Sequence, residues 1–401
     1  MKINLLLLLI CCNLSMANAQ DSLITKIASR HQQIIQHKNQ MFSGKAIDSL
    51  VAEASTRNYV LIGEDHHTNE ILYFTNYLTK KLNFDNYITE SDQLTIDLLR
   101  KYYTEKEEAY NGWLDEYSDH FGFFTFAQDR LLLTSFFDRK KPVIGLDQVL
   151  FNEDIVLFNE LTKITKNSAA KKTYEKLREI SRTRWSKYKQ NPGQKPPFDM
   201  EQFPLMFSDE MTLEIDKLLK LSISERERQI LTAIKESNHI YTLALNNKGL
   251  LSHEIRISLM KRNLLQHYDQ IKGKKNLFKF GANHVTKYKS LFQNSPDVGN
   301  FIYNLADTED QKSLHIAIIQ KEGSTADFFN GEAKTNGFPL LKPFYDLVGD
   351  EQEWLIFDLN KINKEIKNKK VEITSQTLKN YMEGYDCLIV IPKVTAQKKR
   401  E

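Results

Sequence analysis

Residues 58–70 read Asn-Tyr-Val-Leu-Ile-Gly-Glu-Asp-His-His-Thr-Asn-Glu, a stretch that joins an apolar run to a group of acids and histidines. Residues 59–62 are an unbroken apolar run that stops at Gly63. A run of this kind is typical of a strand buried on both faces of a parallel sheet. Gly63 allows a sharp turn or a close approach, and a helix-like pattern begins near Thr68. The stretch therefore predicts a buried strand, a tight turn and a helix.

Four ionisable side chains follow the predicted strand directly: Glu64, Asp65, His66 and His67. The carboxyl ends of strands are where open α/β sheets bind their ligands. A solvated loop rarely needs two acids and two imidazoles at the tip of a buried strand. We therefore interpret this tip as a functional site and assign Glu70, in the first turn of the following helix, to substrate binding.

Two later apolar runs end in the same way. Residues 84–89 lead into Glu90, and residues 143–146 lead into Asp147. Three consecutive strand-then-helix units predict a parallel sheet with right-handed crossovers, whose carboxyl ends share one edge. Glu90 is therefore a catalytic candidate and Asp147 a substrate-binding candidate.

The remaining chain is expected to be helical at residues 21–57 and again from about 150 to 272. Strands are then predicted at residues 277–280, 301–304, 315–320, 354–358 and 387–391, and the last is expected to close the sheet. Gly-Ala-Asn-His at 281–284 follows the first of these and adds Asn283 and His284 to the candidates. The sequence thus predicts an α/β fold with a mostly parallel central sheet flanked by helices. Residues 20–401 are expected to form a single domain with a large helical insertion at about 150–272.

The N-terminus has the features of a secretory signal peptide. Lys2 precedes a short apolar core, and Ala-Asn-Ala at 17–19 is a small-x-small cleavage site, so residues 1–19 are expected to be removed. The apolar run is too short to span a bilayer. Lipidation at Cys11 or Cys12 is the less favoured alternative, because small residues do not precede either cysteine. The mature protein is expected to be secreted or periplasmic.

Composition limits the classes of partner. The formal net charge is only +3, which argues against a nucleic-acid partner, and no later stretch is apolar enough to be transmembrane. Cys387 is the only cysteine of the mature chain, so no internal disulfide can form. A small-molecule substrate is the expected partner, and the oligomeric state stays open.

The candidate residues suit histidine chemistry. An imidazole becomes a good general base when a carboxylate holds its other nitrogen, and Glu64 or Glu90 could hold His66 or His67 in this way. No Gly-x-Ser-x-Gly elbow exists, which disfavours a serine nucleophile. The alternative is a metal site, for which His66, His67, Glu64 and His284 would be the ligands.

Three groups of residues resemble known families. Gly-Glu-Asp-His-His at 63–67 looks like the Gly-Glu-x-x-His signature of the erythromycin esterase family, and also like the Gly-Glu-x-His signature of ChaN-like haem-uptake proteins in the broader Tiki superfamily. Residues 256–263 resemble the esterases' Arg-Asp-x-x-Met-Ala-x-Asn helix at Arg256, Met260 and Asn263, and depart from it at Ile257 and Lys261. Residues 281–284 fall where the esterases carry an Asn-and-His motif.

The esterase resemblance implies a hydrolase in which a histidine held by glutamates activates water against an ester or related acyl bond, with no cofactor required. His67 matches the esterase histidine and His66 the ChaN-like one, and the start of the helix after them favours His67 as the base. Further positions that match polar site residues of the esterases are Glu64, Glu90, Arg256 and His284. The missing aspartate at Ile257 argues against a macrolide substrate.

Two other functions stay open. A ChaN-like protein would bind haem or iron at the cell envelope without catalysis, and a Tiki-like protein would be a metal-dependent peptidase. The helix at 256–263 and the long helical insertion favour the esterase, whereas export favours the haem-binding alternative.

Overall fold

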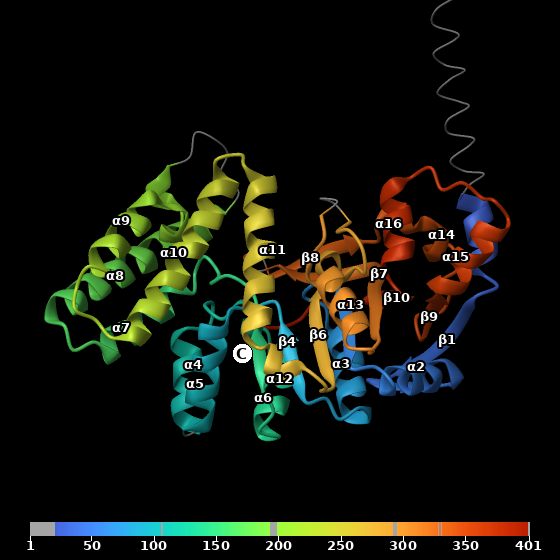
Figure 1. The fold of residues 1–401 in the computed structure, drawn as a ribbon, viewed down its shortest axis with the longest axis horizontal. Coiled ribbons are helices and arrows are strands. Elements are labelled where there is room, and N and C mark those ends of the chain that lie inside the picture. The colour runs from blue at the N-terminus through green and yellow to red at the C-terminus, as the bar shows by residue number, and fades with distance from the viewer. Residues whose placement is uncertain are drawn as a thin grey trace, which may run out of the picture. The chain divides into compact units, whose positions relative to one another are not determined.

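The computed structural model describes residues 21–105, 107–192, 199–291, 295–327, 329 and 331–399, so the expected signal peptide lies outside the described residues. The chain divides into two compact units, and Figure 1 labels the helices and strands from which they are built. The first, the sheet unit, comprises the chain up to Phe84 together with Lys275–Asp327 and Glu332–Gln397. The second, the helical unit, comprises Asp85–Lys274, Phe328–Gly331 and Lys398–Glu401. That the two form a single domain stays a prediction.

The sheet unit contains one mixed β-sheet. Its strand order is β2 (Met41–Ser43), β1 (Gln32–Lys38), β9 (Glu353–Asp358), β10 (Cys387–Val394), β7 (Ser313–Asp327), β3 (Tyr59–Glu64) and β6 (Asn276–Gly281), with β8 (Gly331–Asn336) paired to β7. The pairs β10–β7, β7–β3 and β3–β6 are parallel, whereas β2–β1, β1–β9 and β9–β10 are antiparallel. The expected α/β fold is confirmed, but a mostly parallel sheet is found only on the side that contains β3.

Strand β3 lies where the sequence predicts it. Residues 59–62 of β3 are fully buried, because β7 and β6 flank the strand and the faces of the sheet are covered. The helices of this unit are α2 (Lys45–Ser55), α3 (Asn69–Lys81), α13 (Val298–Thr308), α14 (Lys342–Tyr345), α15 (Leu359–Asn368) and α16 (Gln376–Gly384), with short 3₁₀ turns η4 (Ala282–Val285) and η5 (Pro339–Leu341). Residues 21–28 are also helical.

The expectation of helix throughout residues 21–57 is wrong. Residues 32–43 form the hairpin β1–β2, whose turn residues Asn39 and Gln40 both have positive φ, as a two-residue hairpin of type I′ requires. Ile35 is fully buried whereas its neighbour Ile34 is 43% exposed. This alternation is the period of a strand, and pairing with β9 decides it.

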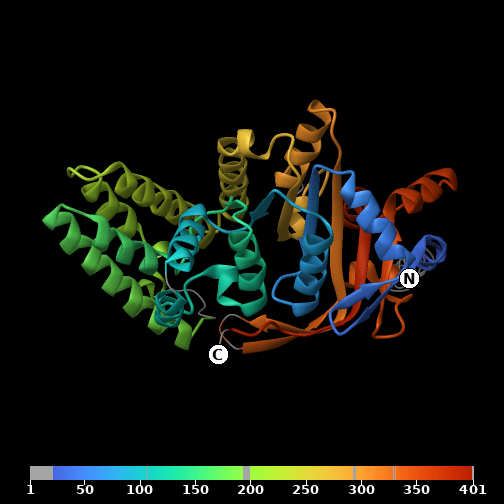
Figure 2. The same cartoon turned by 90° about the horizontal axis from the view of Figure 1, so that it is seen from below.

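Two other expectations about strands are wrong. Residues 301–304 lie in helix α13, which buries Val298, Ile302 and Ala306 at helical spacing. The last strand, β10, lies between β9 and β7 instead of closing the sheet. Its apolar run is buried on both faces, as an interior strand requires. β10 pairs with β7 as far as Val394 and Gly323, and the long strand β7 continues to Asp327 and also pairs with β8. Figure 2 shows the same ribbon turned by 90°.

The helical unit contains the parallel strand pair β4 (Asn86–Thr89) and β5 (Val143–Gly145). Its helices are α4 (Gln93–Thr104), α5 (Glu107–Glu116), α6 (Ala127–Asp138), α7 (Asp154–Ile164), α8 (Ser168–Gln190), α9 (Asp209–Leu218), α10 (Glu225–Leu245), α11 (Gly249–Gln266) and α12 (Tyr268–Ile271), with 3₁₀ turns η1 (Gly122–Thr125), η2 (Met200–Gln202) and η3 (Leu205–Phe207). Between 150 and 272, apart from the undescribed residues 193–198, there is no strand. None of the described helices of the chain has both the length and the apolar composition needed to cross a membrane.

His315 is a structural histidine on β7. It is fully buried, its Nδ1 lies 2.6 Å from the carbonyl oxygen of Val285, and its Nε2 lies 2.9 Å from Ser313 Oγ. The neutral ring satisfies both contacts by donating from Nδ1 and accepting at Nε2. Burial lowers the pKa of His315 from 6.5 to about 4.

This depressed pKa predicts a loss of stability in acid. The neutral ring contributes stability above pH 6.5, and that contribution is lost as the pH falls toward 4, by about 3 kcal/mol at most. Urea unfolding of the wild type and of His315→Gln across this range checks it. The glutamine variant should lose less stability on acidification, and parallel pH curves for the two proteins would contradict the prediction.

Candidate functional site

The carboxyl end of β3 packs directly against the turn that carries His284. Glu64 pairs in register with Gly281, the last residue of β6. A Cβ atom on Gly63 would lie 2.7 Å from Val285 Cγ2 and 2.9 Å from the Cα of Ala282, so only glycine fits there. The absence of a side chain at Gly63 therefore allows η4 to approach the tip of β3.

Glu64 holds two basic groups with one oxygen. His66 Nδ1 lies 2.9 Å from Glu64 Oε1, and Lys279 Nζ donates to the same oxygen at 2.7 Å. The side chains of Glu64 and Lys279 are almost fully buried, whereas that of His66 is 31% exposed. Burial alone raises the pKa of Glu64, but Lys279 and His66 outweigh it and hold the pKa below its ordinary value. Glu64 is therefore a carboxylate that can orient the His66 ring.

Sequence reasoning missed Lys279, although β6 contains a signal for it. The strand reads Asn-Leu-Phe-Lys-Phe-Gly and every residue in it is buried. A lysine in such a strand must be paired, because an isolated buried ammonium is too costly. Its position also bears on the metal alternative, since a cation bound at Glu64 Oε1 would compete with an ammonium that is already there.

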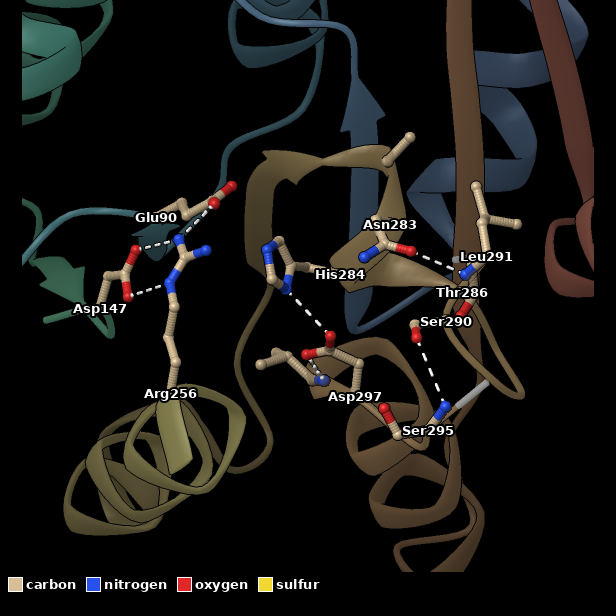
Figure 3. A network of polar contacts seen from close by, with 12 residues as sticks. Glu90, Asp147, Arg256, Asn283, His284, Thr286, Ser290, Leu291, Ser295 and Asp297 are labelled. Carbon is tan, nitrogen blue, oxygen red and sulfur yellow. Dashed lines mark hydrogen bonds and ion pairs between the residues drawn. The ribbon is translucent and has the colours of Figure 1, made fainter. Parts of the chain in front are cut away.

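His284 belongs to a second imidazole–carboxylate pair. Its Nδ1 lies 3.0 Å from Asp297 Oδ2, and both side chains are buried (Figure 3). The other oxygen of Asp297 accepts from the N–H of Val298 at 2.7 Å and so caps helix α13. Asp297 was also missed by sequence reasoning. The signal for it is its position directly before residues 298–306, whose apolar residues have helical spacing, because aspartate is a common N-cap. The prediction of a strand at residues 301–304 hid this signal.

His67 differs from His66 in its backbone. It has a φ of 69°, in the left-handed region that non-glycine residues seldom adopt, and its ring centroid lies 5.7 Å from that of His66. The contact of Glu64 with an imidazole is made to His66. The assignment of His67 as the base stays a prediction.

Two of the expected substrate-binding residues have protein partners. The carboxylate of Glu70 accepts from the backbone N–H and the hydroxyl of Thr395. The side-chain oxygen of Asn283 accepts from the N–H of Leu291 at 2.7 Å (Figure 3). Both side chains therefore hold the chain around the site, and a contact with substrate stays a prediction for each.

Arg256, Glu90 and Asp147 form a cluster in the helical unit. Arg256 Nε donates to Asp147 Oδ1 at 2.9 Å, Nη2 donates to Asp147 Oδ2, and Nη2 also donates to Glu90 Oε1 at 2.8 Å (Figure 3). Asp147 and then Glu90 raise the pKa of Arg256 despite burial, so the arginine stays charged. The three residues line a pocket of about 260 Å³ whose walls include Phe123, Phe151 and Tyr241. Arg256, from the motif at 256–263, therefore contacts the acidic residues that follow two strands of the same unit.

A pair of carboxyl groups lines the same pocket. Asp92 and Glu153 are both buried, and each has one oxygen held by a backbone N–H, from Thr95 and Leu150 respectively. Burial and the neighbouring Asp92 raise the pKa of Glu153 well above its ordinary value, and burial raises that of Asp92. The charge of Asp92 thus opposes ionisation of Glu153, which favours the protonated form of the Glu153 carboxyl group.

The candidate residues therefore fall into two groups. Glu64, His66, His67 and His284 lie in the sheet unit, whereas Glu90, Asp147 and Arg256 lie in the helical unit. That all of them line one pocket stays a prediction.

Comparison with known proteins shows the fold. No protein-family model and no curated protein sequence matches this chain. A Bacillus cereus protein of known crystal structure matches with a TM-score of 0.57 and 17% identity, over 95% of this chain and 99% of the other. A mutant erythromycin esterase in its open conformation matches with a TM-score of 0.55 and 14% identity, over 92% and 98% of the two chains. A succinoglycan biosynthesis protein matches with a TM-score of 0.57 and 13% identity, over 95% and 99%.

Proposed function

We propose that this protein, which shares its fold with an erythromycin esterase, is an exported hydrolase that cleaves an ester or related acyl bond. Water activated by His66 is the nucleophile. The observation that carries the proposal is the contact between Glu64 and His66 at the carboxyl end of β3, with Lys279 buried against the same carboxylate oxygen. The helix start favours His67, but the carboxylate that orients an imidazole lies against His66, and for this reason the proposal names His66.

The geometry supports a base of this kind. With its Nδ1 proton donated to Glu64, the neutral His66 ring carries its lone pair on Nε2, where it can accept a proton from water. Lys279 keeps Glu64 ionised, so that the carboxylate can stabilise the imidazolium formed during the reaction. The 31% exposure of the His66 side chain leaves it accessible to a substrate.

The second pair, His284 and Asp297, is suited to the other half of the reaction. Water adds to the acyl carbon while its proton passes to His66, and the carbonyl oxygen becomes an oxyanion. The intermediate then collapses with cleavage of the acyl C–O bond, and the departing alkoxide takes the Nε2 proton of a His284 imidazolium, whose charge Asp297 stabilises. The proton that His66 gained passes to solvent, and His284 takes one up from solvent, which returns both rings to their starting states. The packing of η4 on Gly63 supports this role, because it brings the turn of His284 against the tip of β3.

The proposal predicts turnover without an added cofactor. The purified mature protein should hydrolyse members of a panel of activated esters, and a chelator should leave the rate unchanged, because the base is an imidazole held by a carboxylate. The release of acid from the esters, measured with and without the chelator, checks this prediction. A haem titration of the same protein tests the haem-binding alternative. Loss of activity on chelation would favour the metal-dependent peptidase, and haem binding with no hydrolysis would favour the ChaN-like function.

A further inference from the structure

The chain beyond β10 runs alongside the functional turn. Residues 395–397, here called the C-terminal strap, pass beside residues 67–70, where Ala396 forms an antiparallel bridge with Thr68. The N–H of Asn69 donates to the carbonyl oxygen of Thr395 at 3.0 Å, and its side-chain amide donates to that of Ala396 at 2.8 Å. The strap is therefore bound to the residues at the start of α3 through an isolated β-bridge and these two hydrogen bonds.

Glu70 fastens the strap at its first residue. Glu70 Oε2 accepts from the N–H of Thr395 at 2.8 Å, and Oε1 accepts from the Thr395 hydroxyl at 2.7 Å. Only 8% of Glu70 is exposed, and burial raises the pKa of its carboxyl group. A carboxylate at this depth depends on its hydrogen bonds, so the contact with Thr395 is the means by which the first turn of α3 holds the strap.

The strap also holds the backbone of His67. The carbonyl oxygen of His67 accepts from the N–H of Gln397 at 3.1 Å and from that of Ala326, at the end of β7, at 3.0 Å. His67 has a φ of 69°, a conformation that costs free energy for a residue with a side chain. The N–H groups of Gln397 and Ala326 hold this carbonyl group and so stabilise the strained turn. The conformation of the turn determines how the side chain of His66 is oriented.

We infer that the C-terminal strap positions the catalytic turn, with Thr395 and Glu70 as positioning residues that act through His67 on the ring of His66. The expected effect on catalysis rests on the proposed function, whereas the effect of the strap on the conformation of the turn does not depend on it. Loosening the strap should therefore change the alignment of the base more than the binding of substrate.

The test compares Thr395→Val with Thr395→Ser in the full-length mature protein, with Thr56→Val as the matched control at an exposed threonine. Valine has the shape of threonine but cannot donate to Glu70, whereas serine can. In Thr395→Val, amide exchange at Asn69 and Gln397 should be about 10- to 100-fold faster, because a hydrogen bond to a charged group is lost. On an ester substrate kcat should fall about 10-fold with KM changed less than about 2-fold, and Thr395→Ser should behave like the wild type.

Nuclear magnetic resonance of the His66 ring nitrogens gives a readout that needs no turnover. Thr395→Val should shift the tautomer signal of His66, and the control and serine variants should not. Unchanged exchange, an unchanged ring signal, or faster exchange with an unchanged kcat would each overturn the inference. If the wild type hydrolyses no ester, the proposed function fails, and the exchange rates and ring signals alone decide whether the strap positions the turn.

Discussion

Replacing His66 with alanine is expected to lower kcat on activated esters by about 10²- to 10⁴-fold, the usual contribution of a general base. Glu64 holds Nδ1 of this ring, and alanine leaves no group that could take the proton from water. KM should change little, because the ring acts on water rather than on the ground state of the substrate. Steady-state kinetics of the variant beside the wild type measure both values.

His67→Ala is the matched comparison, since the two histidines are adjacent in sequence and lie 5.7 Å apart by ring centroid. If His66 is the base, the loss in His67→Ala should be small, and the melting temperature of each variant should stay within a few degrees of the wild type. A large loss in His67→Ala alone would assign the base to the residue that the esterase resemblance favours. Equal small losses in both would refute a histidine-activated hydrolase and leave the haem-binding function ahead.

Replacing Lys279 with methionine should destabilise the protein by about 3–5 kcal/mol, which is the typical cost of breaking a buried ion pair by removing one partner. Methionine fills much of the volume of lysine but leaves the buried Glu64 carboxylate without its ammonium. Glu64 Oε2 has no hydrogen-bond partner among the described residues, so without Lys279 the carboxylate keeps the contact of Oε1 with His66 but gains no replacement for the ammonium. Urea unfolding at neutral pH measures the loss, which should shrink in acid as Glu64 becomes protonated.

The double variant Glu64→Gln with Lys279→Met separates stability from function. With both charges removed, much of the lost stability should return, since no unpaired charge is left in the core. Activity should not return, because His66 has lost the carboxylate that orients it. Lys312→Met, at an exposed lysine just before β7, should change stability by less than about 0.5 kcal/mol. A single variant Lys279→Met as stable as this control would contradict the role given to the pair.

Parts of the candidate site were predictable because the relevant signals are local. Glu64 and Glu90 come directly after apolar runs, and the end of a buried strand fixes where the next side chains lie. Arg256 was found through a resemblance, and its partners Glu90 and Asp147 follow from the same rule about strand ends. The choice between His66 and His67 was not local, because it depends on which ring the turn directs toward Glu64.

Several features could be predicted from the residues alone: the buried strand β3 with Gly63 near its end, the polar residues at the strand ends, and the helices at residues 154–164 and 225–245. These features follow from hydrophobic periodicity and from the conformations open to single residues, which act over a few positions. Tertiary contacts were needed to show that residues 32–43 form a hairpin and that β10 lies inside the sheet. They also pair Lys279 with Glu64, Asp297 with His284 and Thr395 with Glu70. Each of these depends on a partner far away in the chain, such as β9 for β1 or Glu64 for Lys279. Burial makes those pairings obligatory, but the sequence pattern does not say which partner fulfils them.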